Sequence, residues 1–98
     1  MTRTINLRPD AQAEFDDGVD YLDALRPGLG ANLAHAVQQV LARLAVNPRF
    51  GTEVLPGVRR VLLPGTKYCV VYLADDTTHD VISVFHTSRD PAIWRGRI

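Results

Sequence analysis

Tyr68–Leu73, with the sequence YCVVYL, carries almost no polar side chain. β-Branched and aromatic residues favour extended backbone, so this stretch predicts a strand. A strand without polar positions is expected to be covered on both faces of its sheet. The rest of the chain, or a partner, is therefore expected to cover this strand on both faces of the sheet.

Two further apolar runs flank this strand, Arg59–Leu63 before it and Val81–Phe85 after it. The links between them, Pro64-Gly65 and Asp75–Thr78, have the composition of turns. Short links between consecutive strands allow only antiparallel pairing. The carboxyl-terminal half therefore predicts a three-stranded antiparallel meander.

The amino-terminal half predicts two helices. Pro9 suits the first turn of a helix, and Arg26-Pro27-Gly28 ends the apolar stripe that follows it. Apolar residues keep helical spacing again over Leu29–Val46, which Asn47-Pro48 stops. Two helices joined by so few residues lie antiparallel, as a helical hairpin.

With a short strand over Thr4–Leu7, the predicted order is β-α-α-β-β-β, an α+β fold in one domain spanning residues 1–98. The helical hairpin packs on one face of a small antiparallel sheet. It covers only that face well, so the other face is expected to stay apolar and cationic until another chain lies across it. A bound partner is the candidate cover.

Composition narrows the function classes. The 98 residues include 11 basic and 11 acidic side chains, with a net charge of −4 over residues 1–25 and +4 over the rest. No apolar run approaches the ~20 residues that span a bilayer, and no secretory signal opens the chain. Cys69, the single cysteine, has no disulfide partner. We therefore expect a cytoplasmic protein without a membrane partner.

Four local motifs resemble one known family. They are Asn47–Gly51 (NPRFG), Gly57–Arg60 (GVRR), Lys67–Tyr72 (KYCVVY) and Val84–Pro91 (VFHTSRDP), the last followed by Trp94. In this order and spacing they resemble the RelE/ParE superfamily of bacterial type II toxins, also called plasmid stabilisation proteins. The resemblance extends over about the whole chain.

The resemblance implies a toxin that a cognate antitoxin neutralises, in a hetero-oligomer with it. Three hypotheses for growth arrest follow, and fold alone does not choose among them. The first is a ParE-like protein that binds DNA gyrase without chemistry of its own. The second is a RelE-like, ribosome-dependent and metal-independent mRNA endoribonuclease. The third is an inactive relative that only binds its antitoxin.

Cleavage of RNA without a metal needs a base, a cation and an acid. By resemblance, Arg59 or Arg60 matches the family's second-strand cation, while His86 is the candidate base and Arg89 a phosphate clamp. The third-strand arginine of the nucleases falls on Cys69 or Val70, and their terminal tyrosine has only Trp94 in its place. The missing residues favour gyrase binding over cleavage.

The candidate surface for the target or the antitoxin is wider. Because successive strand residues alternate, Arg59 and Arg60 are expected on opposite faces of the sheet. Trp94 is expected to pack back onto the sheet. No histidine has a partner at metal-ligand spacing, so neither a metal nor a cofactor is predicted. The candidate binding residues are Arg59, Arg60, Lys67, Tyr68, Tyr72, Arg89, Trp94 and Arg97.

Overall fold

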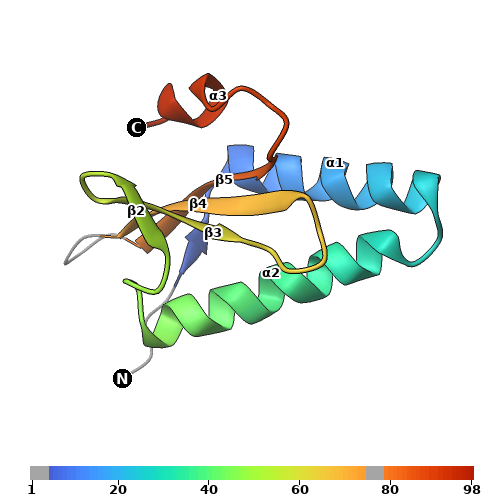
Figure 1. Cartoon of the computed structure of the whole chain (residues 1–98), viewed down its shortest axis with the longest axis horizontal. Helices are drawn as coiled ribbons and strands as arrows, with labels where there is room; N and C mark the ends of the chain where they lie inside the picture. The colour runs from blue at the N-terminus through green and yellow to red at the C-terminus, as the bar shows by residue number, and fades with distance from the viewer. Residues whose placement is uncertain (1–4, 75–78) are drawn as a thin grey trace.

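A computed structural model describes residues 5–74 and 79–98. A helical hairpin lies against one face of a five-stranded sheet with the order β1-β5-β4-β3-β2, and a short third helix lies across the other face (Figure 1). The elements are β1 (Asn6–Leu7), α1 (Pro9–Leu25), α2 (Leu29–Val46), β2 (Thr52–Leu55), β3 (Val58–Leu62), β4 (Tyr68–Ala74), β5 (His79–His86) and α3 (Ala92–Arg95).

The predicted helical hairpin is confirmed, including both ends of α2. Pro9 begins α1, and the turn after it contains Gly28 with φ +97°, a left-handed conformation that glycine adopts at little cost. Gly30 lets the two helices approach closely, because a Cβ there would lie 2.6 Å from the carbonyl oxygen of Val19. The hairpin is therefore fixed by a turn and by a close helix–helix contact.

The sheet is larger and less uniform than predicted. The strands β2 to β5 are antiparallel, but β1 pairs in parallel with β5, so the sheet is mixed. The order β-α-α-β-β-β also missed β2, which pairs with β3 at the far edge, and it missed α3. Thr4 and the predicted turn Asp75–Thr78 lie outside the described residues.

Each face of the sheet has its own core. Leu33, Leu44, Val70 and Tyr72 belong to the core under the two long helices. The opposite core contains Trp94, which is 3% exposed, as predicted from its indole. The chain thus buries the second face with its own residues, which are Val58, Cys69, Val71, Ile82, Phe85 and Trp94. The expectation that a partner covers this face was wrong, and the apolar character of β4 carries no evidence for one.

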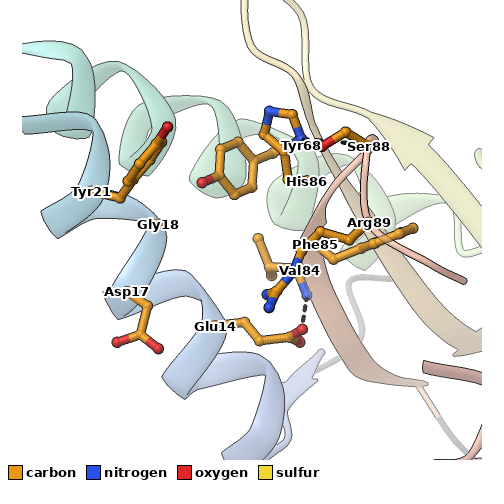
Figure 2. Close-up of a pocket in the computed structure, with 10 residues that line it drawn as sticks. All are labelled: Glu14, Asp17, Gly18, Tyr21, Tyr68, Val84, Phe85, His86, Ser88 and Arg89. Atoms are coloured by element: carbon orange, nitrogen blue, oxygen red, sulfur yellow. Dashed lines mark hydrogen bonds between the residues drawn. The ribbon is translucent and has the colours of Figure 1, made fainter. Parts of the chain in front are cut away.

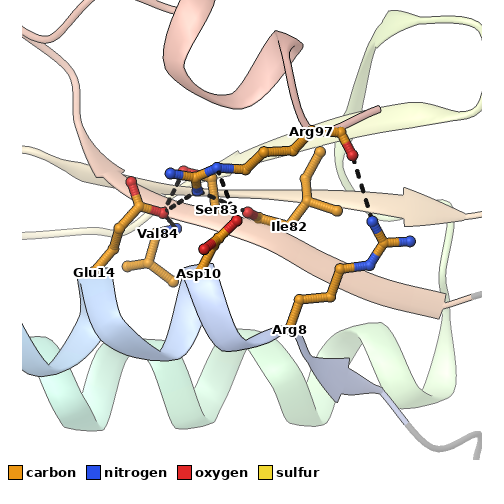
Figure 3. A network of polar contacts seen from close by, with 7 residues as sticks. All are labelled: Arg8, Asp10, Glu14, Ile82, Ser83, Val84 and Arg97. Atoms are coloured by element: carbon orange, nitrogen blue, oxygen red, sulfur yellow. Dashed lines mark hydrogen bonds and ion pairs between the residues drawn. The ribbon is translucent and has the colours of Figure 1, made fainter.

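An ion-pair network ties the end of the chain to α1 and β5 (Figure 3). Nη1 of Arg97 donates to Oε1 of Glu14 over 2.6 Å and to the carbonyl oxygen of Ile82 over 3.0 Å. The same Glu14 oxygen accepts hydrogen bonds from Oγ of Ser83 and from the backbone N–H of Val84. Since β1 ends at Leu7, these side chains satisfy backbone groups on the edge of β5 that no strand reaches.

Candidate functional site

A cleft of about 330 Å³ opens between α1 and the end of β5, and we call it the α1–β5 cleft (Figure 2). The helix contributes acidic and aromatic side chains from one face, and β5 contributes its last residues and the turn that follows. The lining residues are Glu14, Asp17, Gly18, Tyr21, Tyr68, Val84, Phe85, His86, Ser88 and Arg89.

His86 ends β5 and is held from two directions. Its ring packs edge-on against Tyr68, with 5.2 Å between the ring centroids. Its Nδ1 accepts a hydrogen bond from the backbone N–H of Ser88 and lies 2.6 Å from Oγ of that serine. An acceptor at Nδ1 places the proton of the neutral imidazole on Nε2. The ring is thus fixed by a local turn as well as by its edge-on contact with Tyr68.

Tyr68 is buried beneath the cleft. Burial raises the pKa of its hydroxyl, the nearby Tyr21 raises it further, and Arg89 opposes the change. A phenol with a raised pKa stays protonated at neutral pH. Tyr68 therefore offers a hydrogen-bond donor to the cleft and does not act as a base.

Two carboxylates give the α1–β5 cleft a mixed charge. Glu14 has a side chain only 13% exposed, and among the described residues its buried Oε2 has no hydrogen-bond partner. Asp17 lies one turn further along α1. Sequence reasoning missed both residues. The sequence signal that could have located Glu14 was the pair of small residues Ala11 and Gly18, which flank it on the buried side of α1.

The two candidate second-strand cations lie apart, as predicted. On β3, Val61 belongs to the core under the helices and Val58 to the opposite core, so alternation sends Arg59 and Arg60 to different faces. Nη1 of Arg59 donates to the carbonyl oxygen of Gly51 over 2.7 Å. Arg59 thus holds the loop before β2, whereas Arg60 is exposed.

Three other nominated residues serve the fold. The buried Tyr72 hydroxyl donates to the carbonyl oxygen of Pro48 and accepts from the N–H of Gly51, and burial raises its pKa. Trp94 fills the second core, and Arg97 forms the ion pair with Glu14.

The structure thus brings Tyr68, His86 and Arg89 together in the α1–β5 cleft, with Lys67 in a neighbouring hollow. The position where the nucleases carry a third-strand arginine is apolar here. Cys69 and Val70 are fully buried, and burial raises the pKa of the Cys69 thiol to about 12. A neutral buried thiol does not bind phosphate.

Within residues 5–74 and 79–98, no three His, Cys, Asp or Glu side chains gather closely enough to hold a metal ion. Over the same residues, none of the helices has the length and apolar content required to cross a bilayer.

Comparisons with known proteins give the family. The model of the ParE toxin of the type II toxin–antitoxin system parDE matches residues 5–91. A chain of the chromosomal ParDE system from P. aeruginosa superposes with a TM-score of 0.64 at 16% identity, covering 87% of this chain and 96% of that one. The E. coli toxin RelE, a double arginine-to-alanine mutant bound to a RelBc antitoxin peptide, gives a TM-score of 0.66 at 17% identity, covering 100% and 96%.

A search of curated protein sequences gives no match. The structural likenesses show the shared fold, and the family model spans most of the chain. This chain belongs to the ParE toxin family of type II toxin–antitoxin systems.

Proposed function

We propose that this toxin acts in the cytoplasm by binding DNA gyrase, without chemistry of its own, and that a cognate antitoxin neutralises it by direct binding. The antitoxin part draws support from the family match and from the RelE structure, which is bound to an antitoxin peptide. The gyrase part rests on the arrangement of the side chains that RNA cleavage would need.

The observation that carries the gyrase part is that the candidate cations of β3 and the candidate base His86 do not come together at one point. Arg60 of β3 pairs with Val71 of β4, and Val71 pairs with Ser83 of β5, which lies three residues before His86. Two strand spacings and three residues along the strand separate Arg60 from His86 by about 14 Å between Cα atoms. Arg60 is also paired with Val71 of the opposite core, whereas His86 is paired with Tyr68 of the core under the helices, so the two side chains leave opposite faces of the sheet. Arg59 shares the face of His86 but lies one residue further away along β3, and its guanidinium is held by the carbonyl oxygen of Gly51.

The charge of the α1–β5 cleft also disfavours the binding of RNA. His86 and Arg89 share it with the exposed carboxylate of Asp17, which repels the phosphates of RNA, whereas Glu14 is already paired with Arg97. A protein surface does not suffer this penalty, because its basic side chains pair with such carboxylates.

One observation favours the alternative, a ribosome-dependent endoribonuclease. His86 and Arg89 line the same cleft, so a candidate base and a candidate phosphate clamp are neighbours. The third hypothesis, an inactive antitoxin-binding relative, predicts that neither gyrase nor mRNA is affected.

Induced expression separates the three hypotheses in one culture. Gyrase binding predicts growth arrest, relaxed plasmid DNA and intact transcripts. Cleavage predicts truncated mRNA in translated frames with normal supercoiling, and the inactive relative predicts neither. A His86→Gln variant serves as the matched control, since glutamine cannot act as a base: it should keep a gyrase effect and abolish cleavage.

A further inference from the structure

Arg89 lies at the α1–β5 cleft without a partner in the fold. It is exposed in the turn after β5, and its side chain reaches towards α1 (Figure 2). The ion pairs among the described residues use Arg8, Arg59 and Arg97 instead. Within the part of the chain that the structure describes, the Arg89 guanidinium has neither an ion pair nor a hydrogen bond. Its N–H donors therefore remain available to another molecule.

Asp17 supplies the opposite charge from the other wall of the cleft. Six of the 17 residues of α1 are acidic and none is basic. The fold holds four of the six in ion pairs or hydrogen bonds, and these are Asp10, Glu14, Asp16 and Asp23. Asp17 and Asp20 are exposed, and among the described residues neither side chain has such a contact. Asp17 alone of these two lines the cleft, so a carboxylate and a guanidinium share it, both unpaired within the described chain.

The lining near these two charges suits a protein ligand. Tyr21, one turn after Asp17 on α1, is 56% exposed and lines the cleft. Tyrosine is enriched among the residues that carry the binding energy of protein interfaces. The protonated hydroxyl of Tyr68 offers a hydrogen-bond donor to the same cleft. A volume of about 330 Å³ is at the small end of the range for ligand pockets, so the cleft suits a few side chains of a protein segment.

The two opposite charges restrict the chemistry of that segment. The phosphates of a nucleic acid would pair with Arg89 but would be repelled by Asp17. A purely acidic segment meets the same repulsion, and a purely basic one is repelled by Arg89. A segment with an acidic side chain beside a basic one satisfies both groups of the cleft.

We infer that the α1–β5 cleft is the surface that contacts gyrase, and that it receives a gyrase segment carrying an acidic side chain beside a basic one. The acid pairs with Arg89 and accepts a hydrogen bond from the Tyr68 hydroxyl, while the base pairs with Asp17. The inference rests on the proposed function, which supplies gyrase as the partner.

Substitutions that remove one charge each test the two contacts. Arg89→Gln and Asp17→Asn delete side-chain charges that have no partner within the described residues, so both variants should melt at the temperature of the wild type. Arg49→Gln and Asp20→Asn are the matched controls, since both residues are exposed and lie outside the lining of the cleft. Circular dichroism checks the melting temperatures.

The readout is the toxin concentration that halves gyrase supercoiling. Arg89→Gln should raise it at least about tenfold, because a guanidinium makes two charge-assisted hydrogen bonds to a carboxylate. Asp17→Asn should raise it about threefold, since an exposed pair with a single cation is worth less. Both controls should stay within about twofold of the wild type.

The results that would overturn the inference differ in what they say of the target. Wild-type inhibition that neither cleft variant weakens more than its control would retain gyrase as the target and move the contact elsewhere. A stronger effect of Asp17→Asn than of the wild type, together with a weaker effect of Arg89→Gln, would identify a phosphate-bearing ligand in the cleft. No inhibition by the wild type would remove the proposed target and the contact together.

Discussion

One face of the sheet is buried under two helices of 17 and 18 residues, whereas the opposite face lies under α3, which has four. The helix face is made by apolar side chains repeated along both helices. The α3 face depends on Trp94 and on the ion pair of Arg97 with Glu14, which holds the end of the chain (Figure 3). Burial spread over many side chains tolerates single changes, but burial that depends on one anchor does not. The following predictions test that contrast, from the largest expected effect to the smallest.

Trp94→Ala should give the largest loss. Removing a buried tryptophan from a core costs about 3–5 kcal/mol of unfolding free energy. Urea unfolding measures it, with Ile98→Ala as the control because Ile98 is exposed in the same tail. A loss below about 1 kcal/mol would mean that the tail is not an anchor of this face.

Arg97→Ala should cost about 2 kcal/mol, because it leaves the largely buried Glu14 carboxylate without its cation. Adding Glu14→Gln removes that uncompensated charge, so the double variant should be more stable than Arg97→Ala alone. If the two losses simply add in urea unfolding, the ion pair does not couple the tail to α1.

Tyr72→Phe probes the helix face and should cost about 1–2 kcal/mol, since Gly51 and Pro48 each lose a hydrogen bond to the hydroxyl. Tyr21→Phe, at an exposed position, should change stability by less than about 0.5 kcal/mol. If both substitutions lower the unfolding free energy by the same amount in this assay, the Tyr72 hydroxyl does not stabilise the fold.

The Cys69 thiol should leave the stability independent of pH near neutrality and lower it only in alkali. Burial raises the pKa of its thiol from 9.0 to about 12 in the folded chain. Below pH 9 the thiol is protonated in both states, so its contribution is constant. Between pH 9 and about 12 the unfolded chain alone loses the proton, and stability falls by at most about 1.4 kcal/mol per pH unit.

Cys69→Val removes that titration and should flatten the alkaline decline measured by urea unfolding. Tyr68 and Tyr72, whose pKa values burial also raises, contribute to the alkaline decline in the same direction. A native thiol that reacts rapidly with a thiol reagent at pH 7 to 8 would contradict the burial of Cys69.

Sequence patterns predicted the locally encoded parts of the fold. Leu29–Val46 was delimited correctly because Gly28 and Asn47-Pro48 bracket a helical repeat. Thr52–Leu55 escaped prediction because β2 has four residues, pairs only with β3 and is half exposed, so no alternation marks it. Short edge strands are defined by their neighbour more than by their own residues.

The candidate site was predictable only in part. His86 and Arg89 were nominated from a motif at the end of β5, and both line the α1–β5 cleft. Glu14 was not nominated, because its partners Ser83 and Arg97 lie 69 and 83 positions away and only tertiary packing brings them together.

Titration of the purified toxin against gyrase, with relaxed plasmid as substrate, tests the central claim most directly. Binding without chemistry predicts that the toxin blocks supercoiling at micromolar concentrations and that His86→Gln blocks it equally well. Full supercoiling at those concentrations, together with mRNA cleavage on translating ribosomes that His86→Gln abolishes, would contradict the account.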